Sequence, residues 1–192
     1  REFRGIEVSN RICNHCGLVF QSPRMDSEEL SKFYIHQYRQ LYQDDEQPAP
    51  GDLASQAGRA DELLSFSRSY LQTISNHLDI GCSAGLLLLK FQEEYGCSSI
   101  GVEPGEAYRR YAQNQGLTVV PSLEEIPDHT VANGNKDSGQ DKTRFDLVSM
   151  AHVLEHMLDP IEFLQTLKKR FLSNSGYLLI EVPNLYCHDS FE

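Results

Sequence analysis

The fold of this chain is decided by residues 77–85, which read HLDIGCSAG. A short apolar run surrounds Asp79, small residues follow it, and four leucines begin directly after Gly85. This order predicts a strand that turns tightly into a helix, with the turn bringing backbone close to a ligand. A second strand-like run, at residues 98–103, ends in Glu103 at about the spacing at which a carboxylate grips the ribose of a nucleotide. The sequence therefore predicts a site for a nucleoside-containing cofactor.

Strand-like and helical segments alternate through the rest of the chain. Because parallel strands need a crossover between them, this alternation predicts an α/β fold with a doubly wound, mostly parallel sheet. The last two strand-like runs are nearly all apolar, as expected for strands that are covered on both faces. The strand-like runs are residues 77–82, 98–103, 117–120, 145–150 and 177–182, and the helical runs are residues 85–95, 105–115 and 160–172.

The N-terminal part of the chain has a different composition. Residues 1–43 form a small segment with a CxxC pair and a helix that is predicted to begin at Asp26 and to run through Tyr38. Residues 44–58 begin with an acidic, proline-rich stretch, which indicates a surface linker. We therefore expect a small appendage, joined by this linker to a larger domain.

The larger domain is predicted to span residues 59–192. It opens with a helix at residues 59–75, where apolar side chains recur at helical spacing. Residues 127–144 are polar and lack periodicity, which indicates a flexible insertion between the third and fourth strands. Because the chain stops soon after the fifth strand, we expect a sheet that is truncated at that point.

The loop pattern Asp79-x-Gly81-x-Ser83-x-Gly85 resembles the glycine loop of class I S-adenosylmethionine-dependent methyltransferases. The resemblance implies that Gly81 and Gly85 let the backbone approach the amino-acid part of the cofactor. It also implies that Asp79 contacts the cofactor's ammonium group, directly or through water. Ser83 stands where the family commonly has glycine. Cys82 is expected to be a small residue packed within this cofactor loop.

Glu103 and Pro104 extend the same pattern to the second strand. A carboxylate at the end of this strand can accept hydrogen bonds from both hydroxyls of a ribose. A nicotinamide dinucleotide site uses the same geometry, but it normally needs Gly-x-Gly-x-x-Gly for the pyrophosphate, and this loop lacks that spacing. A nicotinamide-dependent oxidoreductase remains an alternative function, and a plain strand-to-helix turn remains an alternative interpretation of the loop.

The fourth strand-like run leads into a histidine-rich segment. Residues 145–160 read FDLVSMAHVLEHMLDP, which resembles the segment after the fourth strand in the same methyltransferase family and adds Ala151 to the expected cofactor site. His156 is the first candidate for a general base and His152 the second, because imidazoles titrate near neutral pH. Glu155 is a candidate partner in catalysis. Alternatively, Glu155 and His156 only brace the loop.

Cys13 and Cys16 form a CxxC pair, and the sequence around them resembles the zinc-binding segment that precedes some sugar C-methyltransferases. Zinc needs four ligands, and the pair supplies two. The resemblance implies a second cysteine pair upstream, although His15 or His36 could substitute for it. Half of a site, with no metal bound, is the alternative.

The composition narrows the range of partners. The formal net charge of −11 argues against a nucleic acid, because a polyanion would be repelled. No apolar run reaches the roughly 18–20 residues of a membrane span, and the first residues lack the apolar core of a signal peptide. The five cysteines are scattered, which fits a reducing compartment. A cytoplasmic location is the default expectation.

Together, these patterns predict methyl transfer from S-adenosylmethionine to a small-molecule acceptor, and the N-terminal resemblance suggests a nucleotide-linked sugar. Zinc is a second cofactor if the CxxC site is complete. A non-catalytic module of the same fold that binds a partner protein and a methyltransferase that acts on a protein are further alternatives. Neither the oligomeric state nor the identity of the acceptor follows from the sequence.

Overall fold

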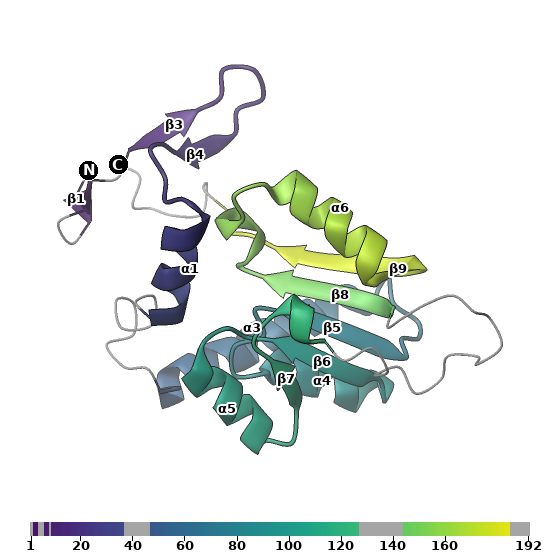
Figure 1. Cartoon of the computed structure of the whole chain (residues 1–192). Coiled ribbons are helices and arrows are strands. Elements are labelled where there is room, and N and C mark those ends of the chain that lie inside the picture. Colours follow the sequence, from purple (N-terminus) through teal and green to yellow (C-terminus); the bar gives the residue numbers. More distant parts are fainter. Residues whose placement is uncertain (1, 4–5, 8, 37–46, 127–143, 185–192) are drawn as a thin grey trace.

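Figure 1 shows the computed structural model of the chain, which describes residues 2–3, 6–7, 9–36, 47–126 and 144–184. The described strands are β1 (Glu2–Phe3), β2 (Ile6–Glu7), β3 (Asn10–Ile12), β4 (Val19–Gln21), β5 (Asn76–Ile80), β6 (Ser98–Val102), β7 (Thr118–Val120), β8 (Phe145–Ala151) and β9 (Leu172–Glu181). The described helices are α1 (Ser27–His36), α3 (Pro50–Ser67), α4 (Leu86–Tyr95), α5 (Glu106–Asn114) and α6 (Pro160–Arg170), with the 3-10 turns η1 (Leu123–Glu125) and η2 (Leu154–His156).

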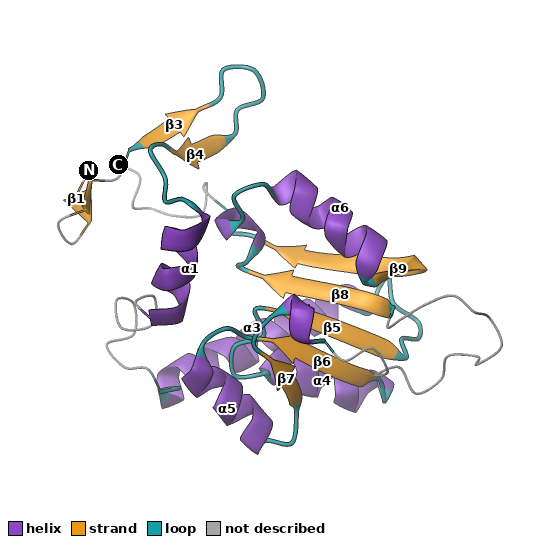
Figure 2. Cartoon of the chain, in the orientation of Figure 1, coloured by secondary structure: helices purple, strands orange, loops and turns teal. Residues whose placement is uncertain are grey.

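The main sheet has five parallel strands in the order β7-β6-β5-β8-β9 (Figure 2). From β5 the chain adds β6 and β7 on one side, then returns and adds β8 and β9 on the other. The predicted doubly wound α/β fold is therefore confirmed. In such sheets a ligand binds beyond the carboxyl ends of the strands, where the strand order reverses. Here that point lies between β5 and β8.

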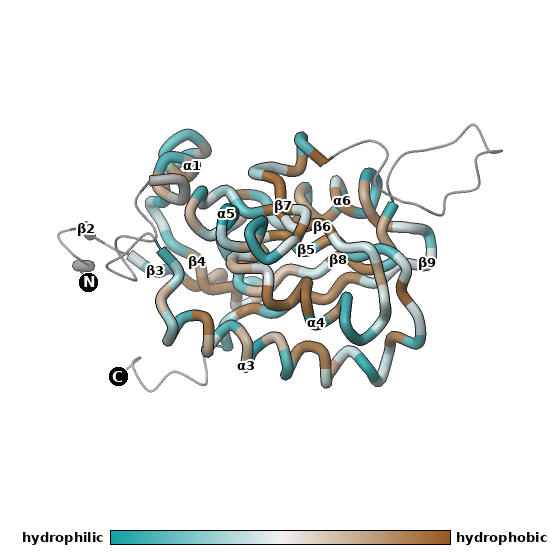
Figure 3. Tube along the Cα trace, turned by 90° about the horizontal axis from the view of Figure 1, so that it is seen from below, coloured by the Kyte–Doolittle hydropathy of each residue, from teal (hydrophilic) through white to brown (hydrophobic). Residues whose placement is uncertain are grey.

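Helices cover both faces of the main sheet. Figure 3 shows the strands between α3 and α4 on one side and α6 on the other. Successive side chains of a strand point to opposite faces, so β8 has to be apolar on both. Leu147 packs in a cluster with Phe91 of α4, and Val148 packs in a cluster with Leu167 of α6. All four of these side chains are fully buried, as the apolar run at residues 145–150 predicted.

Helix α3 corrects the predicted boundary between linker and domain. The helix begins at Pro50 and ends at Ser67, so residues 50–58 are helical and do not belong to a linker, and the predicted helix at 59–75 ends early. Proline is well suited to the first helical position. It lacks a backbone N–H, and an N–H at this position would have no partner within the helix. The proline that suggested a linker is in fact the start signal of α3.

Strand β9 also differs from the prediction. It begins at Leu172 rather than at residue 177, because polar residues 173–176 continue the strand through a register shift against β8. The predicted coverage of both faces is wrong for this strand. Tyr177 is 48% exposed and Ile180 is 36% exposed, since β9 has a strand neighbour on one side only among the described residues.

The N-terminal elements lie outside the main sheet (Figure 1). Strands β3 and β4 form a separate hairpin, and helix α1 follows it. The predicted helix start is confirmed: the Glu29 N–H donates to Asp26 Oδ1 (2.9 Å), and the Asp26 N–H donates to Glu29 Oε2 (3.0 Å). Arg24 links this part to the main domain by donating to the carbonyl of Leu158 (2.6 Å). Tyr38 and residues 127–143 of the expected insertion lie outside the described residues.

Candidate cofactor and acceptor site

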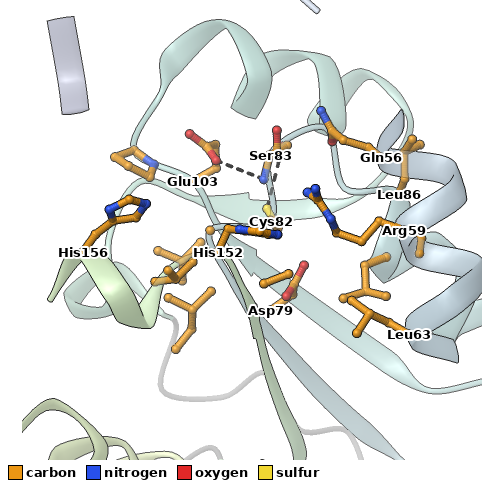
Figure 4. A pocket seen from close by; sticks show the side chains of 18 of the residues that line it. Gln56, Arg59, Leu63, Asp79, Cys82, Ser83, Leu86, Glu103, His152 and His156 are labelled. Atoms are coloured by element: carbon orange, nitrogen blue, oxygen red, sulfur yellow. Dashed lines mark hydrogen bonds between the residues drawn. The ribbon is translucent and has the colours of Figure 1, made fainter. Parts of the chain in front are cut away.

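A pocket of about 580 Å³ opens at the carboxyl ends of the central strands (Figure 4). It lies where the strand order reverses, which is the place that the fold predicts for a ligand. Its walls come from α3, from the loop after β5, from the ends of β6 and β7, and from the segment after β8. The pocket brings together nine of the residues proposed from the sequence: Asp79, Gly81, Cys82, Ser83, Glu103, Pro104, Ala151, His152 and His156.

The loop after β5 explains why this sequence is rich in small residues. Gly81 has φ +73°, and a Cβ there would lie 2.5 Å from a methyl group of Val153. Gly85 has φ +80° and is not part of the pocket wall. A Cβ at Gly85 would lie 2.3 Å from Leu117, so this glycine is needed for packing between helix α4 and the segment after α5. The structure thus gives Gly85 a packing role, and its expected contact with the cofactor stays a prediction.

Ser83 adopts a left-handed backbone conformation, with φ +51°. Side chains with a Cβ are strained in this region, whereas glycine is not. The position therefore suits the glycine that the methyltransferase pattern commonly has there. The backbone N–H of Ser83 points at Glu103 and donates to its Oε2 (3.0 Å).

Cys82 lines the pocket but is nearly inaccessible. Its side chain packs over Gly101 of β6, where a Cβ would lie 2.4 Å from the sulfur. Burial raises the pKa of this thiol well above its ordinary value, so the side chain stays a neutral packing group. The expected packing role of Cys82 in the loop agrees with this geometry.

Glu103 is a buried carboxylate at the end of β6. Its Oε2 accepts from the Ser83 N–H, and its Oε1 accepts from the Gly105 N–H (2.8 Å). A carboxylate oxygen can accept more than one hydrogen bond, so these two backbone bonds do not by themselves use up the acceptor capacity of Glu103. The two backbone bonds fix the plane of the carboxylate and hold the glycine loop against β6.

Asp79 is the second buried carboxylate of the pocket and is 3% exposed. Its Oδ1 accepts a hydrogen bond from the hydroxyl of Ser149 on β8 (2.6 Å). The pKa of Asp79 is raised to about 7. Burial is the main cause and the charge of Glu103 adds to it, while the Ser149 hydrogen bond works in the opposite direction. A cationic group bound in the pocket would favour the ionised form. Asp79 is therefore suited to receive an ammonium group.

Helix α3 contributes three polar pocket residues that the sequence analysis missed: Asp52, Gln56 and Arg59. Gln56 donates to Asp52 Oδ2 (2.7 Å) and accepts the Ala84 N–H of the glycine loop (3.2 Å). Spacings of four and three residues put these polar side chains on one helix face, and this pattern is the signal that could have revealed them. The error at the start of α3 hid it.

The segment after β8 places two histidines at the pocket. His152 has φ +56°, and its ring lies between two carboxylates, with Nδ1 3.4 Å from Glu155 and Nε2 3.7 Å from Glu181. Arg59 approaches Glu181 from α3 (3.5 Å). Figure 4 shows Arg59 and His152 extending toward each other across the pocket. The expected catalytic candidate Glu155 does not line the pocket. Its Oε1 lies within 4 Å of a ring nitrogen of both His152 and His156.

His156 has the properties of a base that is neutral near physiological pH. Burial lowers its pKa below the ordinary value, and the nearby His152 lowers it further, although the charge of Glu155 works in the opposite direction. Its Nε2 lies 3.8 Å from Glu155 Oε1. An imidazole that remains unprotonated can accept a proton, and the adjacent carboxylate would stabilise the cation that forms.

Cys13 and Cys16 lie at the turn of the β3–β4 hairpin, away from the pocket. Backbone and side-chain hydrogen bonds from Cys16, and a backbone one from His15, lower the pKa of the Cys13 thiol, which favours a thiolate. Within the described part of the chain, no group of three or more potential ligands surrounds a metal position. Zinc needs four ligands, so the described residues do not fit a complete zinc site.

The fold and the pocket define an α/β protein with a pocket at the switch point of a parallel sheet. The methyltransferase domain family matches residues 34–191, so the chain belongs to this family. Among the described residues, no helix is both long and apolar enough to cross a membrane. The cytoplasmic location stays a prediction.

Relatives with assigned functions include two bacterial enzymes. The ubiquinone biosynthesis O-methyltransferase of Haemophilus ducreyi is 29% identical over 130 residues, which cover 60% of this chain and 51% of that protein. The enzyme of the same name from Actinobacillus pleuropneumoniae serotype 7 is 27% identical over 111 residues, which cover 56% and 45%. The chain thus spans about half the length of the curated relatives it matches.

Solved structures share the fold. The plantazolicin methyltransferase BpumL, in complex with a triazolic desmethylPZN analog and SAH, superposes with a TM-score of 0.51 and 17% identity, covering 80% of this chain and 58% of that one. At this identity the likeness supports the architecture alone.

Proposed function

We propose that this chain binds S-adenosylmethionine and transfers its methyl group to a small-molecule acceptor. The observation that carries the proposal is the pocket itself, in which buried Asp79, buried Glu103 and the neutral base His156 line a single cavity. Membership of the methyltransferase domain family supports the same conclusion. A nicotinamide site is disfavoured because the loop lacks the glycine spacing that a pyrophosphate needs.

The residues present fit this cofactor. Asp79 would hold the ammonium group, Glu103 the ribose hydroxyls, and the backbone around Gly81 would lie against the amino-acid part. When bound, S-adenosylmethionine supplies a methyl group on a sulfonium, ready for attack by a nucleophile. The two carboxylates would bind different parts of the cofactor, since Asp79 would meet a cation and Glu103 would meet neutral hydroxyls. This difference would fix the direction in which the cofactor lies in the pocket.

On the acceptor side, His156 would take the proton of a hydroxyl. Its lowered pKa keeps the ring free to accept that proton, and Glu155 lies close enough to stabilise the imidazolium. His152 is the second candidate for this role. Apolar side chains, including Leu63, Met157 and Phe163, line the same pocket and would exclude water around the reacting atoms. Alignment of the two reactants would supply much of the rate enhancement.

The acceptor class is proposed as a hydroxyl-bearing small molecule. The name of the Haemophilus ducreyi relative describes an O-methyltransferase of ubiquinone biosynthesis, and the largely apolar pocket walls suit a small organic acceptor. The nucleotide-linked sugar suggested by the CxxC segment has less support, because the described residues complete no zinc site. The zinc question concerns the N-terminal hairpin and enters no step of the proposed reaction.

Calorimetric titration tests the cofactor assignment. We expect S-adenosylhomocysteine and S-adenosylmethionine to bind, and NAD⁺ not to bind. Binding of NAD⁺ without binding of either sulfur compound would overturn the proposal in favour of an oxidoreductase. Transfer of a labelled methyl group to a panel of hydroxyl-bearing small molecules then tests the acceptor class, with a bulk protein acceptor as the alternative. Cofactor binding with no transfer to any acceptor would support a non-catalytic module instead.

A further inference from the structure

A buried polar chain runs beneath the pocket from β5 to β8 and back. His77 Nε2 lies 2.7 Å from the hydroxyl of Ser149, and that hydroxyl donates to Asp79 Oδ1 at 2.6 Å. His77 is 0% exposed, Ser149 1% and Asp79 3%. Polar groups at such depth are costly unless they are hydrogen-bonded, so these three residues depend on one another. Of the three, only Asp79 lines the pocket.

The strand register brings His77, Asp79 and Ser149 together. Asp79 and Ser149 are direct partners in the parallel pairing of β5 and β8, and His77 precedes Asp79 by two residues. Residues two apart on a strand point to the same face, so His77 and Asp79 both face the Ser149 side chain. The sequence shows the three residues but not this meeting, since β5 and β8 are about 70 residues apart.

The number of available protons fixes which group donates and which accepts in each of these two hydrogen bonds. A serine hydroxyl carries one proton, and an ionised carboxylate can only accept. When Asp79 is ionised, Ser149 must therefore donate to it, so the Ser149 oxygen must accept from His77. His77 is then the tautomer with its proton on Nε2. Its Nδ1 has no hydrogen-bond partner among the described residues, and burial lowers the pKa of His77 to about 3, so the ring stays neutral.

We propose that Ser149 and His77 are positioning residues for the cofactor site: together they orient the Asp79 carboxylate and favour its ionised form, which receives the cofactor's ammonium group. Neither residue touches the cofactor in this arrangement. The inference rests on the proposed function, because it assigns to Asp79 a cationic ligand.

The charges around Asp79 make such support necessary. Burial opposes the ionisation of Asp79 most strongly, and the charge of Glu103 at the end of β6 opposes it as well. Arg59 from α3 and His152 after β8 line the same pocket, but both lie within 4 Å of the Glu181 carboxylate. They therefore face another carboxylate besides Asp79. Among the causes that together set the pKa of Asp79 at about 7, the Ser149 hydrogen bond is the one that lowers it. Without it, Asp79 would be neutral over more of the physiological pH range.

The pH dependence of S-adenosylhomocysteine binding tests the inference. In the native chain, affinity should rise as the pH increases through about 7, because binding needs the ionised carboxylate. Ser149→Ala should move this rise upward by about one to two pH units and therefore weaken binding at pH 7 by roughly 5- to 50-fold. Ser99→Ala is the matched control, since Ser99 is a buried serine on β6 whose hydroxyl lies against the Cys97 sulfur (3.5 Å).

Two variants at His77 separate positioning from packing. Glutamine can place an amide N–H near the position of imidazole Nε2, so His77→Gln should keep the native pH profile, whereas His77→Leu should move it in the same direction as Ser149→Ala. Equal pH midpoints in the native chain, Ser149→Ala and His77→Leu would overturn the inference, even if the affinities differed.

A measurement on the unmodified chain covers the case in which a variant does not fold. Nitrogen-15 NMR should report a neutral His77 ring with its proton on Nε2 at pH 8.5, identified among the seven histidines by comparison with His77→Gln or by sequential assignment. A proton on Nδ1 at that pH would contradict the proposed direction of the hydrogen bonds from His77 through Ser149 to Asp79. Failure of S-adenosylhomocysteine to bind at every pH would instead refute the proposed function, and the NMR result would still decide the direction of the hydrogen bonds.

Discussion

Two pocket residues with side chains, Ser83 and His152, have left-handed backbone conformations. Strain of this kind persists only where the surrounding structure imposes it, and it is common at ligand sites. At Ser83 the conformation directs the backbone N–H to Glu103. At His152 it places the ring between Glu155 and Glu181. Both residues hold groups that the proposed function uses.

Ser83→Gly should relieve the left-handed backbone strain at this position. We expect a gain of about 0.5–1 kcal/mol in the free energy of unfolding, because the relief of left-handed strain slightly exceeds the entropic cost of glycine. Urea unfolding measures the change. Gly81→Ala should act in the opposite direction by at least about 1 kcal/mol, since its φ is positive and its Cβ would meet Val153. Gly58→Ala, on the exposed face of α3 with open space around it, is the control and should be neutral or stabilising.

Glu103→Gln should weaken S-adenosylhomocysteine binding by about 1–3 kcal/mol, because an amide has one acceptor oxygen in place of two and carries no charge. Isothermal titration calorimetry measures the loss. Glu106→Gln is the control, since Glu106 lies on the exposed surface of α5 and pairs with Arg110. An unchanged dissociation constant for Glu103→Gln would remove Glu103 from the cofactor site.

His156→Gln should lower kcat by about 10²- to 10⁴-fold and leave cofactor binding intact, as expected for the loss of a general base. Burial lowers the pKa of His156, and a base is active when it is unprotonated. With the cofactor saturating, kcat should therefore fall with decreasing pH only below about 6.5, the ordinary histidine value. If His152→Gln abolishes turnover and His156→Gln does not, the roles of the two histidines are exchanged.

At the scale of elements, helix α3 joins the glycine loop to the rest of the domain. Asp52 receives hydrogen bonds from Gln56 and from the buried Tyr108 of α5 (2.6 Å), and Gln56 in turn receives the Ala84 N–H. One helix thus connects α5 with the loop that begins α4. The pocket wall on this side depends on how α3 packs against α4.

Gln56→Ala should leave the Ala84 N–H without its protein acceptor and should lower cofactor affinity by about 1 kcal/mol, roughly a fivefold change. Ser55→Ala, at the neighbouring exposed position of the same helix, controls for general effects on α3. Calorimetry under identical conditions compares the two. Equal affinities would show that α3 covers the pocket without organising the loop.

At the scale of the whole molecule, the core belongs to the sheet domain. The hydrophobic clusters draw on residues between Ala60 and Leu179, and the N-terminal hairpin leaves apolar side chains such as Ile12 and Leu18 exposed. The described residues of the CxxC hairpin therefore contribute little buried apolar surface to the main domain. We propose that residues 1–46 are an appendage whose removal the sheet tolerates.

Deletion of residues 1–46 should give a folded protein with cooperative thermal unfolding and intact S-adenosylhomocysteine binding, because α3 and the pocket begin after this point. Circular dichroism and calorimetry measure both properties. Loss of cooperative unfolding would show that the appendage is part of the core, contrary to the burial pattern.

The sequence by itself determined the succession of strands and helices along the sheet domain, the fold class, and nine of the pocket residues. These features depend on local chemistry: apolar runs form strands, small residues allow a tight turn, and a carboxylate at a strand end faces the ligand edge of the sheet. The start of α3 was missed because proline and acidic residues mark both linkers and helix N-termini.

Only the tertiary structure decided which distant residues meet. Strand register placed Ser149 between Asp79 and His77, and the packing of α3 brought Asp52, Gln56 and Arg59 to the pocket. It also gave Gly85 a packing role against Leu117 and Ala112. Such contacts follow from how elements pack across the sheet, whereas sequence spacing reports neighbours within one element. The pKa values of Asp79 and His156 depend on burial, which likewise exists only once the chain has folded.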